Sequence, residues 1–514
     1  MTSGIKRRTL LQGILASPFI FSSTKIFSQP LIGKGPVKPV TIRLNSSSHG
    51  NTIGSSITGL SYELAEIKNP DFFSEKNQSL ISLINKLGRN GVLRIGGNTS
   101  DNAIYDEYNG TIPEPTIKVA VSPKSNFHFT KEDLHRLKGF VDAIGWTLIF
   151  GINMKINCPK MGAVLAKDLQ EIFSDRLLAI QIGNEPNNYR YIESGRQFDF
   201  DTWYRLQRVY VAEIEKVASL PVAAPDTGAN TDWLKRYYEL QKNTPFVSRH
   251  YYKGSKTQAS VDKLLETHQG FFNEIRSVTE RLAGTTTGLR LTEVNSYYLG
   301  GADGVSNTYV SCLWGLDYIM QALKVGTVGI NFHGGTLDAV ESSLGSSIRP
   351  EQGMNDTFSY RRSLSSRYSP VAGNSASGFS PMPLFYAMLI GQQFASSQLI
   401  ETRADSNDLN ISAFAAVRSK GKDSGQVLLL IVNKDQHYDA QVSLSGTDGA
   451  GTASIYRLSA SSEDEKAHIH WDMDSFNHES GEWSTSTPES LPLNSGETLL
   501  VRRMSACLVI TDLD

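Results

Sequence analysis

Two glutamates stand where strand-like apolar runs meet polar residues, an arrangement suited to acid/base and nucleophilic chemistry. Glu185 lies in the segment QIGNEPN, residues 181–187, and Glu293 lies in LRLTEVNSYY, residues 289–298. A pair of carboxylic acids can hydrolyse a glycosidic bond, with retention of configuration when the two carboxyl groups lie roughly 5–5.5 Å apart. We therefore interpret the two glutamates as the catalytic pair of a retaining glycosidase.

Each segment alone has another interpretation. Asn-Glu-Pro can begin a helix, with Asn184 as the cap and proline at the first helical position. The second glutamate follows about a hundred residues later, roughly the length of the three βα units that separate strands 4 and 7 in a barrel of about 250 residues. This spacing favours the catalytic pair.

The elements that must position these acids alternate between strands and helices. Eight apolar runs are typical of buried strands: Ile57–Tyr62, Gly91–Ile95, Thr147–Ile152, Leu177–Ile182, Val222–Ala224, Phe246–His250, Leu289–Thr292 and Val328–Phe332. Apolar residues spaced by three and four predict helices between them, including Ser79–Leu87, Lys131–Ile144, Thr202–Val217 and Val261–Leu282. The alternation predicts a (β/α)8 barrel, an α/β fold whose active site lies at the C-terminal ends of its strands.

The pattern changes after Phe385 to short apolar or alternating runs. They cover Leu409–Ala415, Gln426–Val432, Ala440–Leu444, Ala453–Leu458, Leu499–Arg502 and Ala506–Ile510, and turn-forming residues separate them. This predicts a C-terminal antiparallel β-sandwich over residues 381–514, after a catalytic barrel over 53–380. An independent carbohydrate-binding module is the alternative, but no obvious linker separates it from the barrel, so we expect tight packing.

One stretch of the barrel region fits neither pattern. Residues 337–380 are rich in Ser, Gly and Asn, have few apolar positions, and include Arg349, Arg361, Arg362 and Arg367. We expect a long loop that starts on the active-site face, because it follows the eighth strand. Loops of this length are either functional or disordered, so a role at the rim of the cleft and mere surface decoration both remain open.

The first thirty residues are typical of a targeting segment. Lys6, Arg7 and Arg8 precede an apolar run, residues 10–21, that is too short to span a bilayer. Paired arginines there predict a twin-arginine signal peptide over 1–30 and bacterial export to the periplasm or medium. An ordinary Sec signal or an uncleaved anchor are the alternatives.

Charge and cysteine content exclude several classes of partner. Removing residues 1–30, which hold four basic residues and no acidic ones, leaves a formal charge of −6. A net acidic chain is a poor candidate for binding nucleic acid or for a strongly basic polyanion groove. The three cysteines, Cys158, Cys312 and Cys507, are widely spaced without a CxxC motif, which argues against a metal site or a disulfide framework. We expect no metal or organic cofactor.

Several motifs together resemble glycoside hydrolase family 79, the β-glucuronidase and heparanase family of clan A. Besides the two glutamate segments, they are GLSYE (59–63), LRIGGNTSD (93–101), HYY (250–252) and NFHGG (331–335). The resemblance runs from about residue 40 to the C-terminus. It implies that Glu185 is the acid/base and Glu293 the nucleophile. It also implies that residues 31–52, through Val40–Asn45, add a strand to the β-sandwich.

The resemblance extends to residues around the two acids. Arg94 resembles the strand 2 arginine that supports the nucleophile, with a salt bridge at the rim as the alternative. His250 and Tyr251 lie where such barrels place hydrogen-bond partners of the nucleophile, although a histidine satisfied by the backbone is equally expected. The amide of Asn184 can donate to the sugar 2-hydroxyl, a contact that strengthens in the transition state, unless it only caps a helix.

Family 79 recognises a uronic acid carboxylate through neutral groups. Tyr298 matches the strand 7 tyrosine, and Gly334 and Gly335 match the strand 8 backbone donors. Thr336 stands where close relatives have a second tyrosine, so carboxylate binding is expected to be weaker or rearranged. Glu63 and Asp101, after the first two strands, are further expected to accept hydrogen bonds from the sugar 3- and 4-hydroxyls.

These features lead us to expect a secreted retaining exo-β-glucuronidase. Its substrate would be an oligosaccharide or polysaccharide with terminal β-glucuronic acid or 4-O-methylglucuronic acid. We expect a monomer or homodimer that binds neither nucleic acid nor, after cleavage of the signal, a membrane. An endo-acting, heparanase-like enzyme, a neutral-sugar β-glycosidase and a catalytically silent glycan-binding protein are the alternatives.

Overall fold

The computed structural model describes residues 32–45, 47–118, 126–351, 356–419, 421, 423–446, 451–493 and 497–512. The signal peptide expected over 1–30 lies outside the described residues. Within the described ranges, no helix combines the length and the apolar character needed to cross a bilayer.

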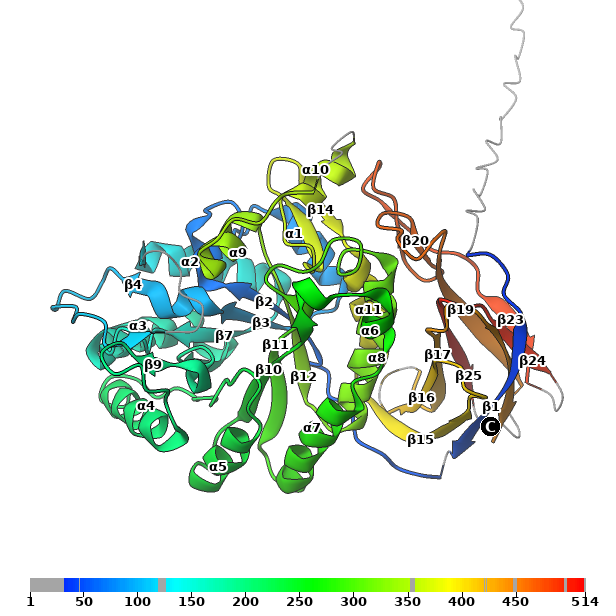
Figure 1. The fold of residues 1–514 in the computed structure, drawn as a ribbon, viewed down its shortest axis with the longest axis horizontal. Coiled ribbons are helices and arrows are strands. Elements are labelled where there is room, and N and C mark those ends of the chain that lie inside the picture. Colours follow the sequence, from blue (N-terminus) through cyan, green and yellow to red (C-terminus); the bar gives the residue numbers. More distant parts are fainter. Residues whose placement is uncertain are drawn as a thin grey trace, which may run out of the picture.

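Seven parallel strands form most of a barrel (Figure 1). They are β2 (Thr58–Glu63), β3 (Val92–Gly96), β7 (Thr147–Ile152), β8 (Leu177–Ile182), β10 (Phe246–Ser255), β11 (Gly288–Tyr298) and β12 (Gly329–Gly334). Neighbours in the sheet follow the order β10-β11-β12-β2-β3-β7-β8. The strands therefore run in sequence order around the barrel, with one gap between β8 and β10.

The fifth predicted strand, Val222–Ala224, fills that gap without forming a regular ladder. A parallel bridge joins Val222 to Ile180 of β8, and another joins Thr227 to Arg249 of β10. Prolines at 221 and 225 flank the segment. Because proline has no N–H to donate, neither residue can supply a donor to a continuous ladder. The ring is thus closed by single bridges rather than by an eighth full strand.

Helices surround the barrel strands. They are α1 (Gln78–Lys86), α2 (Lys131–Ile144), α3 (Pro159–Phe173), α4 (Phe200–Ile214), α5 (Asp232–Leu240), α6 (Val261–Leu265), α7 (Gln269–Leu282), α8 (Tyr309–Lys324) and α11 (Pro383–Gln392). Helix α2 has the predicted bounds because a Thr130–Asp133 capping box starts it and Gly145, with φ +73°, ends it. The single helix predicted over Val261–Leu282 is instead broken into α6 and α7.

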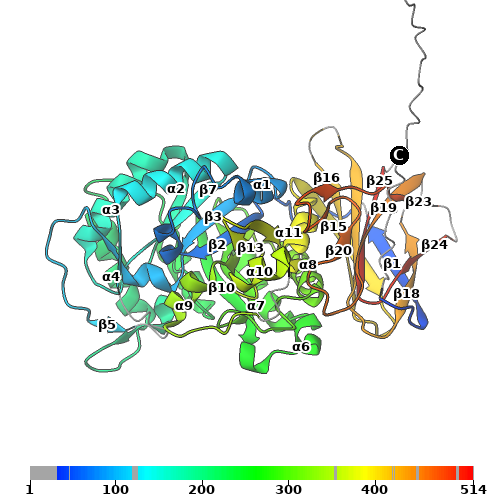
Figure 2. The same cartoon turned by 90° about the horizontal axis from the view of Figure 1, so that it is seen from above.

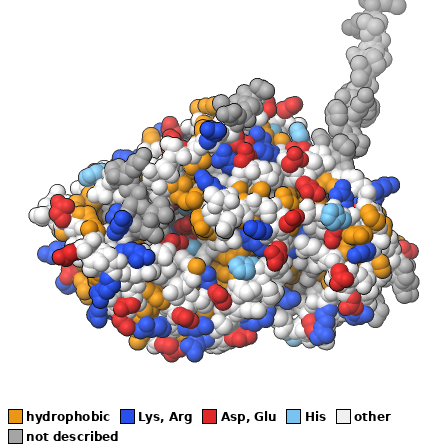
Figure 3. Space-filling model, in the orientation of Figure 1, with side chains coloured by type: hydrophobic (Ala, Val, Ile, Leu, Met, Phe, Trp, Pro, Cys, Tyr) orange, Lys and Arg blue, Asp and Glu red, His pale blue; other side chains and the backbone are white. Residues whose placement is uncertain are grey.

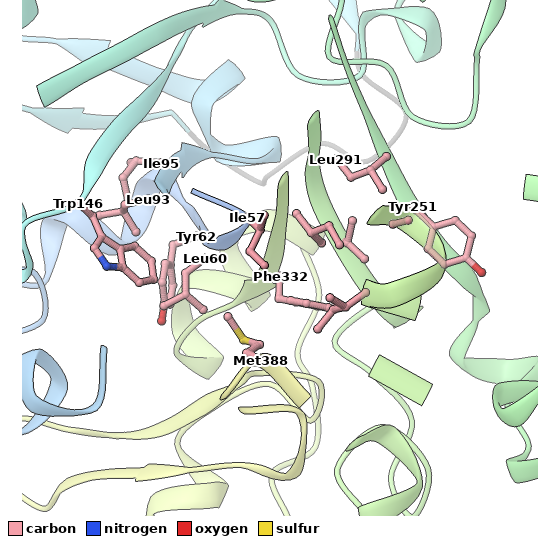
Figure 4. Packing of buried hydrophobic residues seen from close by; sticks show 14 of the residues in the cluster. Ile57, Leu60, Tyr62, Leu93, Ile95, Trp146, Tyr251, Leu291, Phe332 and Met388 are labelled. Atoms are coloured by element: carbon pink, nitrogen blue, oxygen red, sulfur yellow. The ribbon is translucent and has the colours of Figure 1, made fainter. Parts of the chain in front are cut away.

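Side chains alternate between two environments along the barrel strands. Leu93 and Ile95 of β3 pack in the large core that includes the surrounding helices, as Figure 4 shows. Val92 belongs to a separate interior cluster with Ile149, Ala179, Ala223 and Phe246. Successive side chains of a strand point to opposite faces, so Arg94 lies on the interior side with Val92. The apolar interior cluster therefore forms a floor, and polar side chains occupy the interior above it.

The C-terminal part forms the predicted antiparallel β-sandwich from one sheet that folds over itself (Figure 2). Its longer strands are β15 (Ser397–Asp405), β16 (Ile411–Arg418), β17 (Gln426–Asn433), β18 (Asp439–Ser445), β19 (Thr452–Ala460), β24 (Thr498–Val501) and β25 (Ser505–Asp512). Strand β15 pairs with β16 through residues 397–400 and with β1 (Val37–Asn45) through residues 401–405, so it connects the two layers. Strand β1 also pairs in parallel with β18, and lies within the sandwich in Figure 1.

The sandwich packs tightly on the barrel. Leu428 and Leu430 of β17 belong to the main core, whereas Leu429 and Ile431 face the core of the sandwich. At the end of β17, the buried Lys434 donates to Asp317 of α8 and to Thr267, each at 2.8 Å. Helix α11 belongs to the barrel layer, packed against α8 and β2. The last barrel helix thus lies beyond the domain boundary expected at residue 380.

The long loop expected over residues 337–380 contains regular structure. It includes α9 (Leu337–Leu344), α10 (Thr357–Ser363) and a hairpin of β13 (Val371–Asn374) and β14 (Gly378–Pro381). Thr336 and Asp356 cap the two helices with their side chains. The segment is therefore not one long loop as expected, because these short elements depend on local caps and tertiary contacts rather than on a periodic apolar face.

Candidate active site

Glu185 and Glu293 converge on one imidazole. Glu185 follows β8, and Glu293 lies within β11 where the pairing with β12 is irregular. His250 Nδ1 lies 2.9 Å from Glu185 Oε1 and 3.8 Å from Glu293 Oε2. The sum of these distances, about 6.7 Å, is the upper limit on the separation of the two oxygens, which leaves room for the roughly 5–5.5 Å that retention requires.

The surroundings of Glu293 favour its ionised form. Arg94 Nη1 donates to Oε2 at 2.8 Å, and the Tyr252 hydroxyl donates to Oε1 at 2.8 Å. Burial by itself raises the pKa of Glu293, but the charges of His333, His250 and Arg94 and the Tyr252 hydrogen bond outweigh it and lower the pKa to about 2. Glu293 is therefore a buried carboxylate at any ordinary working pH.

Arg94 is the buried centre of this network. Its guanidinium donates to Glu293, to Asn184 Oδ1 at 2.8 Å and to Asp226 Oδ2 at 2.9 Å. It also donates to Ser61 Oγ at 3.0 Å and Gln181 Oε1 at 3.1 Å. Burial lowers its pKa, but the carboxylates of Asp226 and Glu293 more than compensate and raise it. Arg94 thus lies below the acids as a fixed positive charge, not in a rim salt bridge.

Glu185 has a more open environment than Glu293. Its side chain is 27% exposed, against 10% for Glu293. Asn188 Nδ2 donates to Oε2 at 3.0 Å, and the Glu185 backbone N–H donates to the carbonyl of Asp226 at 3.0 Å. The residue adopts φ +50°, a left-handed conformation that costs a non-glycine residue about 1–3 kcal/mol and that clusters at functional sites.

Asn184 and Asp101 are held in an internal hydrogen-bond network. Asn184 Oδ1 accepts from Arg94, and its Nδ2 donates to Asn98 Oδ1 at 3.0 Å. Asp101 accepts from the Tyr189 hydroxyl and from the backbone N–H groups of Asn184 and Met154. Burial raises the pKa of Asp101 to about 6 despite those donors. Asp101 therefore supports the backbone of Asn184, which differs from its expected role as a hydroxyl acceptor.

Glu63 ends β2 and lies beside residues 98–102, the segment that carries Asp101. It accepts from the Thr99 backbone N–H at 2.9 Å and from the Thr99 hydroxyl at 2.7 Å, both on Oε2. Its Oε1 lies 3.6 Å from Nε2 of His333. Those donors hold Oε2, and this orientation of the carboxylate is compatible with the expected contact between Oε1 and a sugar hydroxyl.

Tyr251 does not face the site. Its hydroxyl lies 3.2 Å from His268 Nδ1, and its ring packs on Phe271 and Tyr318 in the helical layer. Figure 4 shows the ring pointing away from the labelled residues of β2 and β3. The neighbouring Tyr252 contacts Glu293 instead. The prediction for Tyr251 was wrong because alternation along β10 sends residues 250 and 252 to the interior and residue 251 outward.

Two further tyrosines lie near Tyr252. Tyr298 is 44% exposed, and its ring stands edge-on to that of Tyr252 at 6.2 Å. Tyr368, from the 337–380 segment, is buried. The centroid of its ring lies 6.1 Å from that of Tyr252 and 6.0 Å from that of His333. Burial and the charges of Glu293 and Glu63 raise the pKa of Tyr368, so its hydroxyl stays protonated. That segment therefore supplies a side chain to the site.

The backbone donors expected at Gly334 and Gly335 have internal partners. Gly335 N–H donates to Ser369 Oγ at 3.3 Å, and Gly334 pairs with Tyr62 in the barrel ladder. Thr336 donates its N–H and its hydroxyl to Glu66, each at 3.0 Å. Gly335 has φ +141°, which favours glycine at this turn. Gly335 thus shapes the turn into α9, and its N–H already has a partner within the protein.

Asp226 was not singled out from the sequence, yet it joins most of the site. The pattern that revealed the glutamates, a carboxylate at the end of an apolar run, also holds for Asp226 after 222–224, but that run is very short. Tyr252 was recognisable from alternation once His250 was placed inside. Tyr368 gave no local signal. Among the described residues, no cluster of His, Cys, Asp and Glu is arranged to hold a metal ion.

Comparison with curated proteins finds distant relatives. The chain is 24% identical over 302 residues to a β-glucuronidase of Aspergillus niger, covering 52% of this chain and 55% of that protein. It is 22% identical over 354 residues to a β-glucuronidase of Neurospora crassa, covering 58% and 61%. The chain therefore spans less than two thirds of the length of these curated relatives. No protein-family model matches the chain.

Solved structures share the fold over most of the chain. A 4-O-α-L-rhamnosyl-β-D-glucuronidase from Fusarium oxysporum 12S has a TM-score of 0.67 and 20% identity, covering 91% of this chain and 99% of that one. A family 51 arabinofuranosidase from Xanthomonas axonopodis pv. citri has a TM-score of 0.64 and 13% identity, covering 92% and 100%. These likenesses, together with the strand order, confirm the predicted fold class of a (β/α)8 barrel with a C-terminal β-sandwich.

Proposed function

We propose that this protein is an exported retaining β-glucuronidase of the family 79 type, which releases terminal β-glucuronic acid or its 4-O-methyl form from glycans. One observation carries the proposal. Glu293 is buried and held ionised by Arg94 and Tyr252, whereas Glu185 is more exposed and lies within 6.7 Å of it at most. Two carboxyl groups in such different environments suit the separate roles of nucleophile and acid/base.

The chemistry follows in two steps. A carboxylate oxygen of Glu293 attacks the anomeric carbon while Glu185 gives its proton to the departing glycosidic oxygen, which leaves a covalent glycosyl-enzyme. Glu185, now a carboxylate, then takes a proton from water as that water attacks the anomeric carbon and releases Glu293. Each displacement inverts the configuration, so the product retains the β-configuration.

Support for a uronide substrate comes from the curated relatives and from the tyrosines. Tyr368 is a protonated hydroxyl near Glu293, and Tyr298 extends the group of tyrosines to the exposed rim, whereas the proton of Tyr252 is already donated to Glu293. Neutral hydroxyls can bind a sugar carboxylate without an arginine clamp. A neutral-sugar β-glycosidase is the second candidate, for two reasons. The N–H of Gly335, one of the two expected strand 8 donors, already donates to Ser369, and Thr336, which replaces the second tyrosine, already donates to Glu66.

Endo action on a sulfated polyanion is less well supported. On the face shown in Figure 3, Lys and Arg side chains are interspersed with Asp and Glu rather than gathered in a groove. A long polyanion would need a continuous basic surface to compensate its charge. We therefore favour exo action on the end of a glycan chain.

The test is hydrolysis of a panel of aryl β-glycosides: glucuronide, 4-O-methylglucuronide, glucoside, galactoside and xyloside. Wild type should act selectively on the glucuronides, and proton NMR should show the β-anomer as the first product. Glu293→Ala should abolish turnover of every aryl glycoside. Glu280→Ala, an exposed glutamate on α7, is the matched control and should retain wild-type rates.

Each other outcome has a defined meaning. Turnover of a neutral glycoside alone would replace the uronide specificity with the second candidate. The α-anomer as first product would exclude double displacement. Binding of glucuronides without turnover or a covalent adduct would indicate a silent glycan-binding protein.

A further inference from the structure

His250 is held between carboxylates on both of its ring nitrogens. Nδ1 lies 2.9 Å from Glu185 Oε1, and Nε2 lies 3.1 Å from Asp226 Oδ1. Glu293 Oε2 is 3.8 Å from Nδ1, beyond hydrogen-bond distance. The imidazole side chain is 1% exposed, so no solvent competes for either nitrogen. Its hydrogen-bonding partner among the two catalytic acids is therefore Glu185 and not Glu293.

Asp226 is built to remain a carboxylate. Its Oδ1 accepts from Gln181 Nε2 and from the Thr292 hydroxyl, each at 2.6 Å, and its Oδ2 accepts from Arg94. Burial raises its pKa, but Arg94 and His250 and these donors outweigh burial and lower the pKa well below its ordinary value. Because Asp226 is a carboxylate and can only accept, Nε2 must carry a proton to donate to it. The other ring nitrogen, Nδ1, is the one that meets Glu185.

The backbone joins the same residues. The carbonyl of Asp226 accepts the N–H of Glu185 at 3.0 Å, and both residues adopt left-handed conformations, with φ +52° and φ +50°. The backbone N–H of His250 donates to the carbonyl of Thr227, the residue that follows Asp226, at 2.7 Å. Strand ends four, five and six are thus tied at the level of the acid/base, and the imidazole has little freedom to swing toward Glu293.

We propose that His250 and Asp226 are positioning residues for Glu185, with the imidazolium of His250 stabilising the carboxylate that Glu185 becomes when it protonates the leaving group. This inference rests on the proposed function. In the first step the bond between the anomeric carbon and the leaving oxygen breaks, and its electron pair takes the proton of Glu185. The Nδ1 proton is not transferred. It stays on His250, and the Nδ1–H group donates a hydrogen bond to the new carboxylate. In the second step Glu185 takes a proton from water, and His250 again keeps its own.

The charge of His250 agrees with this role. Burial lowers its pKa, but the carboxylates of Asp226 and Glu293 and the hydrogen bonds to Asp226 and Glu185 raise it to about 10. The charged groups that face the ring are Asp226, Glu185, Glu293 and Arg94, whose Nη2 lies 3.4 Å from Nε2. The carboxylates on both ring nitrogens therefore favour the imidazolium form of His250.

The test is the dependence of kcat/KM on the leaving group, measured with aryl β-glucuronides from 2,4-dinitrophenyl to phenyl. The glycosidic oxygen of the phenyl substrate needs a proton, whereas dinitrophenolate leaves without one. His250→Asn should therefore lower kcat/KM for the phenyl substrate about 100-fold, at the lower end of general-acid contributions, but less than about 5-fold for dinitrophenyl. Asp226→Asn should give the same trend with a smaller slope.

Tyr252→Phe is the matched control, because it lies on the same strand two residues on and donates to Glu293 instead. It should lower kcat/KM by a similar factor across the series. An equal loss across the series for His250→Asn, or no loss, would overturn the inference. If His250→Asn fails to fold by near-ultraviolet circular dichroism, a flat series for Asp226→Asn overturns it. Absence of turnover by wild type on every substrate would instead refute the proposed function, and this inference with it.

Discussion

Adjacent tyrosines on β10 offer a sharp test of the site geometry. Tyr252 donates to Glu293 Oε1 at 2.8 Å, whereas the Tyr251 hydroxyl is directed to His268 in the helical layer. Replacement by phenylalanine removes one hydroxyl from either residue and keeps the ring. Tyr252→Phe should therefore change the chemistry of Glu293, and Tyr251→Phe should change only the packing of the barrel wall.

The magnitude follows from the bond that is lost. A hydrogen bond to a charged group contributes about 1.5–3 kcal/mol, and one unit of pKa corresponds to about 1.4 kcal/mol. The Tyr252 hydroxyl stabilises the charged form of Glu293, so its loss should raise the pKa of that carboxyl from about 2 by about 1–2 units. Under the proposed mechanism Glu293 must be ionised to attack, so the acidic limb of the activity profile should move to higher pH by the same amount.

The assay is kcat/KM for one aryl β-glucuronide between pH 2 and pH 7, with wild type and both variants. A limb near pH 2 leaves the wild-type value nearly constant at higher pH, whereas a limb raised by about 1–2 units falls inside the range. Titration of the substrate is common to all three and cancels in the comparison. Tyr251→Phe should keep the wild-type limb while losing about 1 kcal/mol of unfolding free energy in urea, from one hydrogen bond. An unmoved limb in Tyr252→Phe, or a limb moved by Tyr251→Phe, would refute the assignment of Tyr252 to the nucleophile.

Three further predictions concern the acid/base, the domain interface and a buried carboxyl. Glu185→Ala should lower kcat/KM about 10²–10⁴-fold with a poor leaving group, and azide should restore turnover by forming a β-glycosyl azide, detectable by mass spectrometry. Lys434→Met leaves Asp317 buried without its cation, so the free energy of unfolding measured in urea should fall by about 3–5 kcal/mol. Adding Asp317→Asn to that variant removes the unpaired charge and should recover part of the loss. Burial raises the pKa of Glu66 to about 7, although the hydrogen bonds from Thr336 act in the opposite direction. The stability that comes from the neutral acid is therefore complete below about pH 4.5, and it is lost as the pH rises through 7. Glu66→Gln should match wild type near pH 5 and exceed it by up to about 3 kcal/mol near pH 8, and parallel melting curves against pH for the two proteins would contradict this.

The barrel was predictable because its signal is local. Runs such as Leu177–Ile182 and Thr147–Ile152 have the bounds of β8 and β7, since a strand buried on both faces is apolar throughout. Strand β15 was missed because its second half, residues 401–405, pairs with β1 and carries polar side chains. The elements of residues 337–380 were missed for a similar reason, because their caps and contacts, not an apolar period, define them.

The site was predictable only in part. Glu185 and Glu293 each stand out against the apolar run that precedes them, and Arg94 stands out within one. Asp226 follows a run too short to attract notice, and Tyr368 lies in a segment without any periodic pattern. Which carboxylate His250 contacts depends on a difference of about an ångström between 2.9 and 3.8 Å, and no sequence pattern encodes such a distance.

The sequence by itself determined the class of fold and the order of its elements, and it singled out Glu185 and Glu293, because apolar periodicity and the breaks in it are properties of neighbouring residues. Tertiary structure alone decided how the acids are tuned. The closing of the ring brings Arg94, Asp226, His250 and Glu293 together from four different positions of the barrel, and burial there makes each charge depend on the others. That interdependence exists only once the strands have met, which is why the roles of His250, Tyr252 and Asp226 follow from the structure and not from the order of residues.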